Sequence, residues 1–282
     1  MSRIRVFIIG LFMFAALASV SFAQDLKPEE IIAKHLDAIG KKTTRDSLKT
    51  MLIGGRGSFE SKNPVVRGGG QAMVVSNPDN LYFMINFKSN DYPFEKVGYF
   101  ADKVSIPFVN AGKRSLLGSF LAENSKILSD GLFGGVMSMK WPLMGSGNSK
   151  LRLRSLGTKK IDDKKVYAVD FLPSGSGSSD FNIKLYFDAE TFRHIRSEYR
   201  REFLPGAAVF GTSNQIAGST LSLTEDFSDF RTVEGLTLPY AYSVRFNSNT
   251  NAAMYENTWG ITVVQYIFNQ NLTPDFFTFD VK

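Results

Sequence analysis

The stretch Leu81-Tyr82-Phe83-Met84-Ile85-Asn86-Phe87 decides the class of fold. Every second residue from Leu81 to Phe87 is strongly apolar, and this period of two is typical of a β-strand that buries one face. Residues 183–187 repeat the pattern, because Ile183, Leu185 and Phe187 alternate with Lys184 and Tyr186. The chain is therefore expected to be mainly β.

Further strands follow the same reasoning from Met51 onward. They are expected at 71–75, 97–101, 166–172, 194–200, 219–226, 240–246 and 258–267. Turn-rich segments such as 76–80 separate them, which favours an antiparallel meander over βαβ units. The polar segment 174–179 is too short to separate two domains, so one domain over 24–282 is expected.

One helix is predicted before the first strand. Pro28 suits a first helical turn, and Glu29 and Glu30 complement the positive end of the helix dipole. Gly40 is expected to end this helix after the apolar face that closes with Ile39.

The first 23 residues predict a cleaved signal peptide. Arg3 and Arg5 precede an apolar stretch at 6–20, and Ala23 ends a small-residue cleavage site. The apolar stretch is shorter than the about 20 residues of a membrane span, so a retained anchor is the weaker alternative. We expect an exported protein, and the style of the signal favours the periplasm.

Composition excludes several classes of site. The 282 residues contain no Cys and 2 His, which removes disulfides, cysteine metal sites and cysteine nucleophiles and argues against a multi-histidine metal centre. The formal net charge of +6 is spread along the chain, so no nucleic-acid partner is expected. Neither a metal nor a cofactor is predicted.

No catalytic motif stands out, and we expect the protein not to be an enzyme. The Gly-x-Ser-x-Gly and Walker patterns do not occur, and Glu60 spoils the dinucleotide pattern that begins at Gly55. His35 and His194 are expected to be structural or surface residues. Acidic residues in predicted turns are expected to be solvated: Asp162, Asp163, Glu225, Asp226 and Asp229. A secreted hydrolase stays open as a minor alternative.

An apolar insert at about 112–144 interrupts the strands. Leucine, isoleucine and phenylalanine recur at helical spacing between Leu116 and Leu128, and glycines such as Gly131 and Gly134 supply flexible joints. Two interpretations are compatible here: a helix that packs on an open sheet, and a lid over a cavity.

An exported, aromatic-rich β protein with such an insert is suited to hold an apolar ligand. Each CH₂ group kept from water contributes roughly 0.8 kcal/mol, so one long acyl chain contributes on the order of 10 kcal/mol. Met137, Met139 and Met144 would give an adaptable wall. The alternative for each of these residues is ordinary core packing.

Three motifs resemble the LolA/LolB-like superfamily of lipoprotein-localisation factors. An Asn-Pro turn at Asn77 precedes the aromatic strand that begins at Leu81. The segment 185–192 resembles the family's strand–turn–strand around Asp-x-x-Thr, and 272–279 is similar to its closing strand. The similarity extends over nearly all of 24–282.

This resemblance implies an unclosed antiparallel half-barrel covered by helices over a hydrophobic cavity. Its ligand would be an acylated lipoprotein or lipid, received from an inner-membrane donor complex and passed to an outer-membrane acceptor, with transient membrane-surface contact possible. The family's carriers have an Arg where Asn77 stands, so the lid is expected to be held differently here.

The predicted ligand-binding residues fall into two sets. The cavity wall is expected to comprise Leu81, Phe83, Ile85, Phe87, Leu185 and Phe187. The lid is expected to contribute Phe120, Leu132, Phe133, Met137 and Trp141. The alternative function is an envelope stress-sensing or scaffolding module that binds a protein partner through the same fold. The cluster at 199–202 is expected to be a solvated strand end or a contact to anionic headgroups or a partner.

Overall fold

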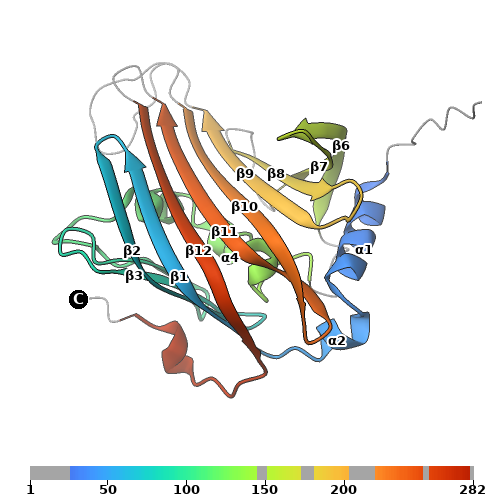
Figure 1. Cartoon of the computed structure of the whole chain (residues 1–282), viewed down its shortest axis with the longest axis horizontal. Helices are drawn as coiled ribbons and strands as arrows, with labels where there is room; N and C mark the ends of the chain where they lie inside the picture. Colours follow the sequence, from blue (N-terminus) through green and yellow to red (C-terminus); the bar gives the residue numbers. More distant parts are fainter. Residues whose placement is uncertain (1–25, 145–150, 173–180, 203–219, 250–253, 280–282) are drawn as a thin grey trace, which may run out of the picture.

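The computed structural model describes residues 26–144, 151–172, 181–202, 220–249 and 254–279. One antiparallel sheet of twelve strands organises them (Figure 1). The strands are β1 Met51–Lys62, β2 Val65–Ser76, β3 Leu81–Phe87, β4 Phe94–Phe100, β5 Lys103–Ser105, β6 Arg152–Ile161, β7 Lys164–Leu172, β8 Phe181–Asp188, β9 His194–Glu202, β10 Thr220–Val233, β11 Leu236–Asn249 and β12 Met254–Phe268.

The strand order is β5-β4-β3-β2-β1-β12-β11-β10-β9-β8-β7-β6. Neighbours in this order are also neighbours in sequence except at the centre, where β1 pairs with β12. The edge strands β5 and β6 are not paired with each other, so the sheet is an unclosed half-barrel. The predicted mainly β, antiparallel fold is confirmed.

The insert joins the two edges and packs against the inward face of the sheet. Its helices are α3 Leu116–Glu123, α4 Lys126–Ser129 and the 3₁₀ turn η1 Gly135–Met137. Figure 1 shows this segment in green behind the central strands. The helices α3 and α4 contact β4, whereas η1 contacts β9 and β11, so the insert bridges both halves of the sheet.

Glycines allow β3 to fold closely over β1 and β2. A Cβ at Gly57 would lie 2.1 Å from Cγ2 of Ile85, and a Cβ at Gly70 would lie 1.7 Å from the carbonyl oxygen of Asn86. Any side chain at these positions would collide with β3. Gly70, in the Gly-rich segment 67–70 of β2, thus permits the close approach of β3.

The two faces of the sheet follow the predicted alternation. Leu81, Phe83, Ile85 and Phe87 of β3 are buried, and Asn86 is exposed. The residues Ile183, Leu185 and Phe187 of β8 join the same core. A smaller cluster of Val166, Ala168 and Tyr186 lies apart from this core.

The predicted N-terminal helix is confirmed with its bounds. Helix α1 spans Pro28–Ile39 and ends at Gly40, whose amide bonds to the carbonyl of Leu36. It buries Ile31, Ile32 and Ile39. A short helix, α2 Lys42–Asp46, follows and was not predicted.

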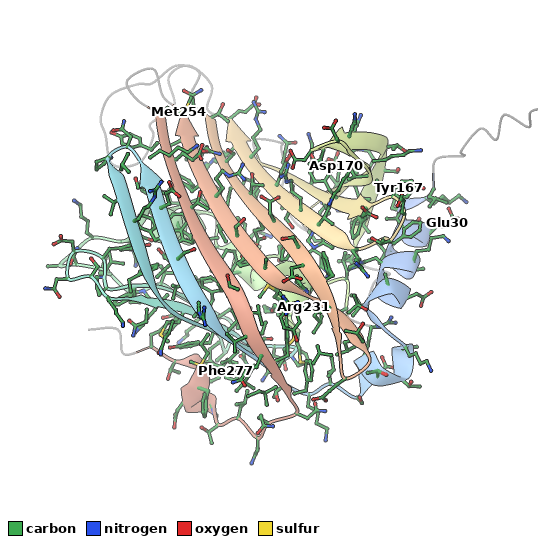
Figure 2. All side chains as sticks on the ribbon, in the orientation of Figure 1. Glu30, Tyr167, Asp170, Arg231, Met254 and Phe277 are labelled. Carbon is green, nitrogen blue, oxygen red and sulfur yellow. The ribbon has the colours of Figure 1, made fainter. Side chains whose placement is uncertain are left out.

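The prediction that 272–279 forms a closing strand is wrong. This segment contains the 3₁₀ helix η3 Pro274–Phe277, because Pro274 at the first helical position fixes a helical φ and offers no N–H to a sheet. Phe277 instead stacks on Phe100, and Phe279 packs against Tyr82 with tilted rings. Figure 2 shows Phe277 beside the sheet, and β12 is the last strand of the described chain.

Two general features of the described residues bear on function. None of their helices has the length and apolar character needed to span a membrane. They also contain no group of three or more His, Asp or Glu side chains arranged to hold a metal ion. The predicted signal peptide lies outside the described residues, and it stays a prediction.

Candidate functional site

All eleven residues of the predicted wall and lid lie in one hydrophobic cluster. Each is at most 7% exposed. They are Leu81, Phe83, Ile85, Phe87, Leu185 and Phe187 on the sheet and Phe120, Leu132, Phe133, Met137 and Trp141 on the insert. The structure thus brings the two predicted sets together.

Aromatic rings of the insert pack against rings of the sheet. The ring centroids of Phe83 and Phe133 are 5.2 Å apart and nearly perpendicular, and those of Phe120 and Phe246 are 5.5 Å apart. Trp141 stacks on His194 with 4.9 Å between centroids. Side chains of the insert therefore fill the space between the insert backbone and the inward face of the sheet.

A pocket of about 620 Å³ opens between the insert and β6 to β9. Residues 123–132 of the insert form one wall and the ends of β6, β7, β8 and β9 form the other. Leu132 is the member of the eleven predicted residues that lines it. The lining is Glu123, Asn124, Ser125, Lys126, Ile127, Asp130, Leu132, Arg152, Arg154, Asp170, Phe171, Leu172, Phe181, Asn182, Ile183 and Arg201.

The pocket has an apolar floor and a charged mouth. Ile127, Leu132 and Ile183 are buried, whereas Leu172 is 39% exposed. At the mouth, Nε of Arg154 donates to Asp170 at 3.1 Å. Figure 2 labels Asp170 on β7. An apolar floor with polar groups at its rim is the usual form of a small-molecule site.

Burial makes ionisation of two carboxylates at the mouth less favourable. Burial raises the pKa of Glu123, which Arg201 opposes, and it also raises the pKa of Asp130, which Lys126 and Lys140 oppose. Arg201 also reaches Oδ1 of Asn124 on the insert at 3.4 Å. Positively charged side chains therefore lie close to the carboxylates around the opening of the pocket.

A buried carboxylate at Glu225 joins the sheet to the insert. Its Oε1 accepts the amide of Gly134 at 2.7 Å and the hydroxyl of Tyr242 at 2.5 Å, and its Oε2 lies 2.7 Å from the hydroxyl of Tyr199. The same Tyr199 hydroxyl lies 3.1 Å from the carbonyl oxygen of Leu132. Glu225 is thus surrounded by groups from β9, β11 and the insert.

This arrangement corrects the prediction that Glu225 is a solvated turn residue. Glu225 is 0% exposed and lies within β10, where it follows Leu221 and Leu223 on the inward face. Burial raises its pKa to about 7, although the tyrosine hydroxyls and the Gly134 amide oppose the shift. The charge of Asp226 raises it slightly further.

A second buried carboxylate, Glu95 on β4, holds the start of the insert helix. Its side chain accepts hydrogen bonds from the hydroxyls of Tyr92 and Ser115, the latter at 2.9 Å. Ser115 is also the N-cap of α3, because its Oγ accepts the amide of Gly118 at 2.7 Å. Burial raises the pKa of Glu95 to about 7.

The two histidines are structural residues of the core. Both are buried, and burial lowers the pKa of His35 to about 4 and that of His194 well below its ordinary value. The Nδ1 atom of His35 bonds to the carbonyl of Phe192 at 3.0 Å, and Nε2 of His194 lies 3.1 Å from Oγ of Ser197. Their ring centroids are 6.1 Å apart, and burial disfavours a positive charge on either ring.

A sequence signal for the two carboxylates exists. Glu225 occupies the apolar phase of the alternation Leu221, Leu223, Glu225, Phe227, and Glu95 precedes Val97 and Tyr99 in the same phase of β4. A carboxylate in the inward phase of an amphipathic strand indicates a buried acid. The sequence prediction grouped Glu225 with Asp226 and Asp229 as solvated acids, and it did not single out Glu95.

The residues of the Tyr199–Glu202 cluster lie in different surroundings. Tyr199 is buried beside Glu225, so the expectation of a solvated strand end is wrong for this residue. Arg200 pairs with Glu202 at 3.0 Å on the surface, and Arg201 lines the pocket.

These features define an unclosed antiparallel half-barrel whose inward face is filled by a helical insert. The sequence matches no protein-family model and no curated protein. Among solved structures, the chain is similar to a LolA superfamily protein of Nitrosomonas europaea at 10% identity, over 90% of this chain and 99% of that chain, with a TM-score of 0.46.

Two further structures show similar coverage. A putative outer membrane lipoprotein-sorting protein domain from Vibrio parahaemolyticus matches at 11% identity over 87% of this chain and 97% of that chain, with a TM-score of 0.42. A DUF1329 family protein from Desulfovibrio piger matches at 9% identity over 89% and 96%, with a TM-score of 0.43. The superfamily named from the sequence motifs is among the matches, as a distant similarity that concerns the fold alone.

Proposed function

We propose that the protein binds the acyl chain of a lipid or lipoprotein between the insert and the inward face of the sheet. The observation that supports this most directly is the pocket at the end of the interior, with its floor of Ile127, Leu132 and Ile183. A volume of about 620 Å³ lies within the range of roughly 300–1,000 Å³ that is common for small-ligand sites.

The proposed site extends from the pocket into the space that the insert now fills. Phe133 and Leu132 of the insert cover inward side chains such as Phe83. If the insert moves outward, an acyl chain replaces these contacts with its own and keeps the same apolar surface from water. The exchange costs little because one apolar surface is substituted for another.

The proposed physiological role is that of a periplasmic carrier. An acylated ligand would arrive from a donor at the inner membrane and leave to an acceptor at the outer membrane. Transfer in this direction requires only that the acceptor bind the chain more tightly than the open carrier does. The charged mouth would contact the polar part of the ligand.

A matched pair of variants tests the site. Leu172→Asp places a charge at the exposed rim of the pocket, whereas Val264→Asp places one at a residue of β12 that is 62% exposed and does not line the pocket. A synthetic lipopeptide with one palmitoyl chain serves as the probe. We expect Leu172→Asp to weaken binding about tenfold or more and Val264→Asp to leave it unchanged.

Native mass spectrometry of protein purified without detergent identifies the ligand class. A stoichiometric acylated molecule supports the proposal. Absence of any bound lipid, together with no binding of the lipopeptide to either variant or the parent chain, contradicts it.

The packed interior also favours a second candidate, a module that binds a protein partner without lipid. The insert fills the inward face with its own aromatic side chains, so the fold is complete without a ligand. In that case, protein stripped of lipid would bind the partner as well as untreated protein does.

A further inference from the structure

The hydrogen bonds between Glu225 and the insert differ between its ionised and neutral forms, because the Leu132 carbonyl accepts the Gly135 amide at 3.2 Å in both forms but the Tyr199 hydroxyl in only one. The Tyr199 hydroxyl has a single proton and two acceptors within reach, Oε2 of Glu225 at 2.7 Å and the carbonyl of Leu132 at 3.1 Å. If Glu225 is a carboxylate, Tyr199 donates to it, and the Leu132 carbonyl loses that donor.

A proton on Glu225 completes the chain of hydrogen bonds. Oε2 then donates to the Tyr199 oxygen, and Tyr199 donates to the Leu132 carbonyl. The Oε1 atom still accepts from the Gly134 amide and from Tyr242. The neutral form therefore makes two links to the insert, at Leu132 and at Gly134, whereas the ionised form keeps one.

We propose that Glu225 is a proton-controlled latch that holds the insert closed when it is neutral and releases it when it is ionised. This inference concerns the regulation of the acyl-chain site and rests on the proposed function for its biological meaning. The latch itself is a property of the protein without ligand.

The charged groups near Glu225 agree with this role. From β9 and β11 it faces the hydroxyls of Tyr199 and Tyr242, and from the insert the backbone amide of Gly134 donates to it. Asp226, the next residue of β10, pairs with Arg196 at 2.6 Å and with Arg245 at 3.4 Å. Arg196 pairs with Asp162 as well, at 3.2 Å, so both guanidinium groups have acidic partners other than Glu225, and burial raises the pKa of Glu225 to about 7.

The direction of the effect follows from linkage. In an open state Glu225 meets water, and its pKa returns toward the ordinary value of 4.5, so the closed state holds the proton more tightly. Closure is consequently strongest at low pH and weakens as the pH rises through about 7. Alkaline conditions favour opening.

The test uses the absence of cysteine in the chain. Val136→Cys places a single thiol at a buried residue of η1, and its rate of reaction with a thiol reagent reports opening of the insert. The rate is measured without ligand in two backgrounds, with Glu225 and with Glu225→Gln. The substituted glutamine side chain mimics the neutral acid, because its amide donates to Tyr199 and its carbonyl accepts from Gly134 and Tyr242.

The ratio of the two rates at each pH cancels the titration of the thiol and of His194, which stacks on Trp141 in the insert. We expect the Glu225 protein to react faster than Glu225→Gln by a factor that grows about tenfold or more between about pH 5.5 and about pH 8.5. A ratio that stays constant with pH overturns the latch. If Val136→Cys prevents folding, Met137→Cys in the same turn serves as the reporter.

Two controls complete the experiment. Ala168→Cys places the thiol in the small cluster apart from the insert, and its rate should not depend on residue 225 unless the whole sheet unfolds. Glu198→Gln removes a different carboxylate, on β9, which accepts a hydrogen bond from the Tyr186 hydroxyl at 2.8 Å. This substitution should leave the reaction rate of Val136→Cys unchanged. Because no ligand is present, failure of the latch is distinguishable from failure of lipopeptide binding.

Discussion

Buried glutamates hold the insert at two points, at Ser115 near its first end and at Gly134 toward its second end, but in different ways. At the first end, Glu95 accepts from two side-chain hydroxyls, of Tyr92 and Ser115. At the second end, Glu225 accepts from a backbone amide, Gly134, as well as from tyrosines. Hydroxyls can rotate toward new partners, whereas an amide is fixed by the chain, so the second end sets the position of the backbone more strictly.

The ends also differ in how they accommodate a proton. When Glu225 is protonated, it donates to the Tyr199 oxygen, and Tyr199 donates to the Leu132 carbonyl. At the first end, Ser115 already accepts from Gly118, and Tyr92 accepts from Nε1 of Trp259 at 2.7 Å. A proton on Glu95 therefore competes with donors that are already in place. A proton therefore adds a link to the insert at the second end, whereas at the first end it displaces a donor that is already in place.

The largest expected effect comes from removing each carboxylate. Glu225→Ala leaves the Gly134 amide without its acceptor, and we expect it to lower the free energy of unfolding by about 3 kcal/mol. Glu95→Ala leaves only rotatable hydroxyls and should cost about 2 kcal/mol. Urea denaturation at about pH 6 measures both, and Glu198→Ala should change stability by less than about 1 kcal/mol. Equal losses at the two ends would contradict the distinction.

An intermediate effect is expected from pH. Both glutamates have a pKa of about 7 in the folded protein and an ordinary value of 4.5, so their stabilising contribution is complete below 4.5 and is lost as pH rises through 7. The free energy of unfolding of Glu225→Gln should gain about 1 kcal/mol relative to the parent chain between about pH 6 and about pH 8.

The difference between variant and parent is the informative quantity in that measurement. The buried histidines have lowered pKa values, so their contribution is present above their ordinary pKa of 6.5 and is lost toward acid, in the opposite direction. Subtracting the two curves removes it. A difference that does not change with pH would show that Glu225 does not titrate in this range.

The smallest effect is expected at the N-cap of α3. Ser115→Ala removes the bond to the Gly118 amide and one donor to Glu95, and it should lower the free energy of unfolding by about 1 kcal/mol. Ser115→Thr keeps the hydroxyl and should lose less than half of that, as thermal denaturation can show. An equal loss in both variants would mean that the space around Ser115, and not its hydroxyl, matters.

Much of the sheet could be predicted because its signals are local. Helix α1 has Pro28 at its start and Gly40 at its end, and β3 and β8 alternate strictly enough to give their inward faces. The turn after β8 is also encoded locally, since Oδ1 of Asp188 accepts the amides of Glu190 and Thr191. Such features depend on residues a few positions apart.

The parts that escaped prediction depend on distant neighbours. The edge strand β6 begins Arg152-Leu153-Arg154 and has no strongly apolar face, so its sequence resembles a surface segment until β7 pairs with it. Glu225 becomes a buried acid only because β9, β11 and the insert bring hydroxyl and amide donors to it. The pocket likewise exists only where the insert meets four strand ends, which no single segment encodes.

The pairing of β1 with β12 has a consequence for folding. Met51 lies opposite Phe268, so the centre of the sheet joins two segments at opposite ends of the described chain. Each half of the meander can form from neighbouring hairpins, but the two halves cannot be joined before the last strand is present. Formation of this central seam should limit the folding rate, because closing so long a loop costs the most chain entropy. A chain that stops short of β12 would then have two separate half-sheets with exposed inner edges, which favours capture by other chains over completion of the fold.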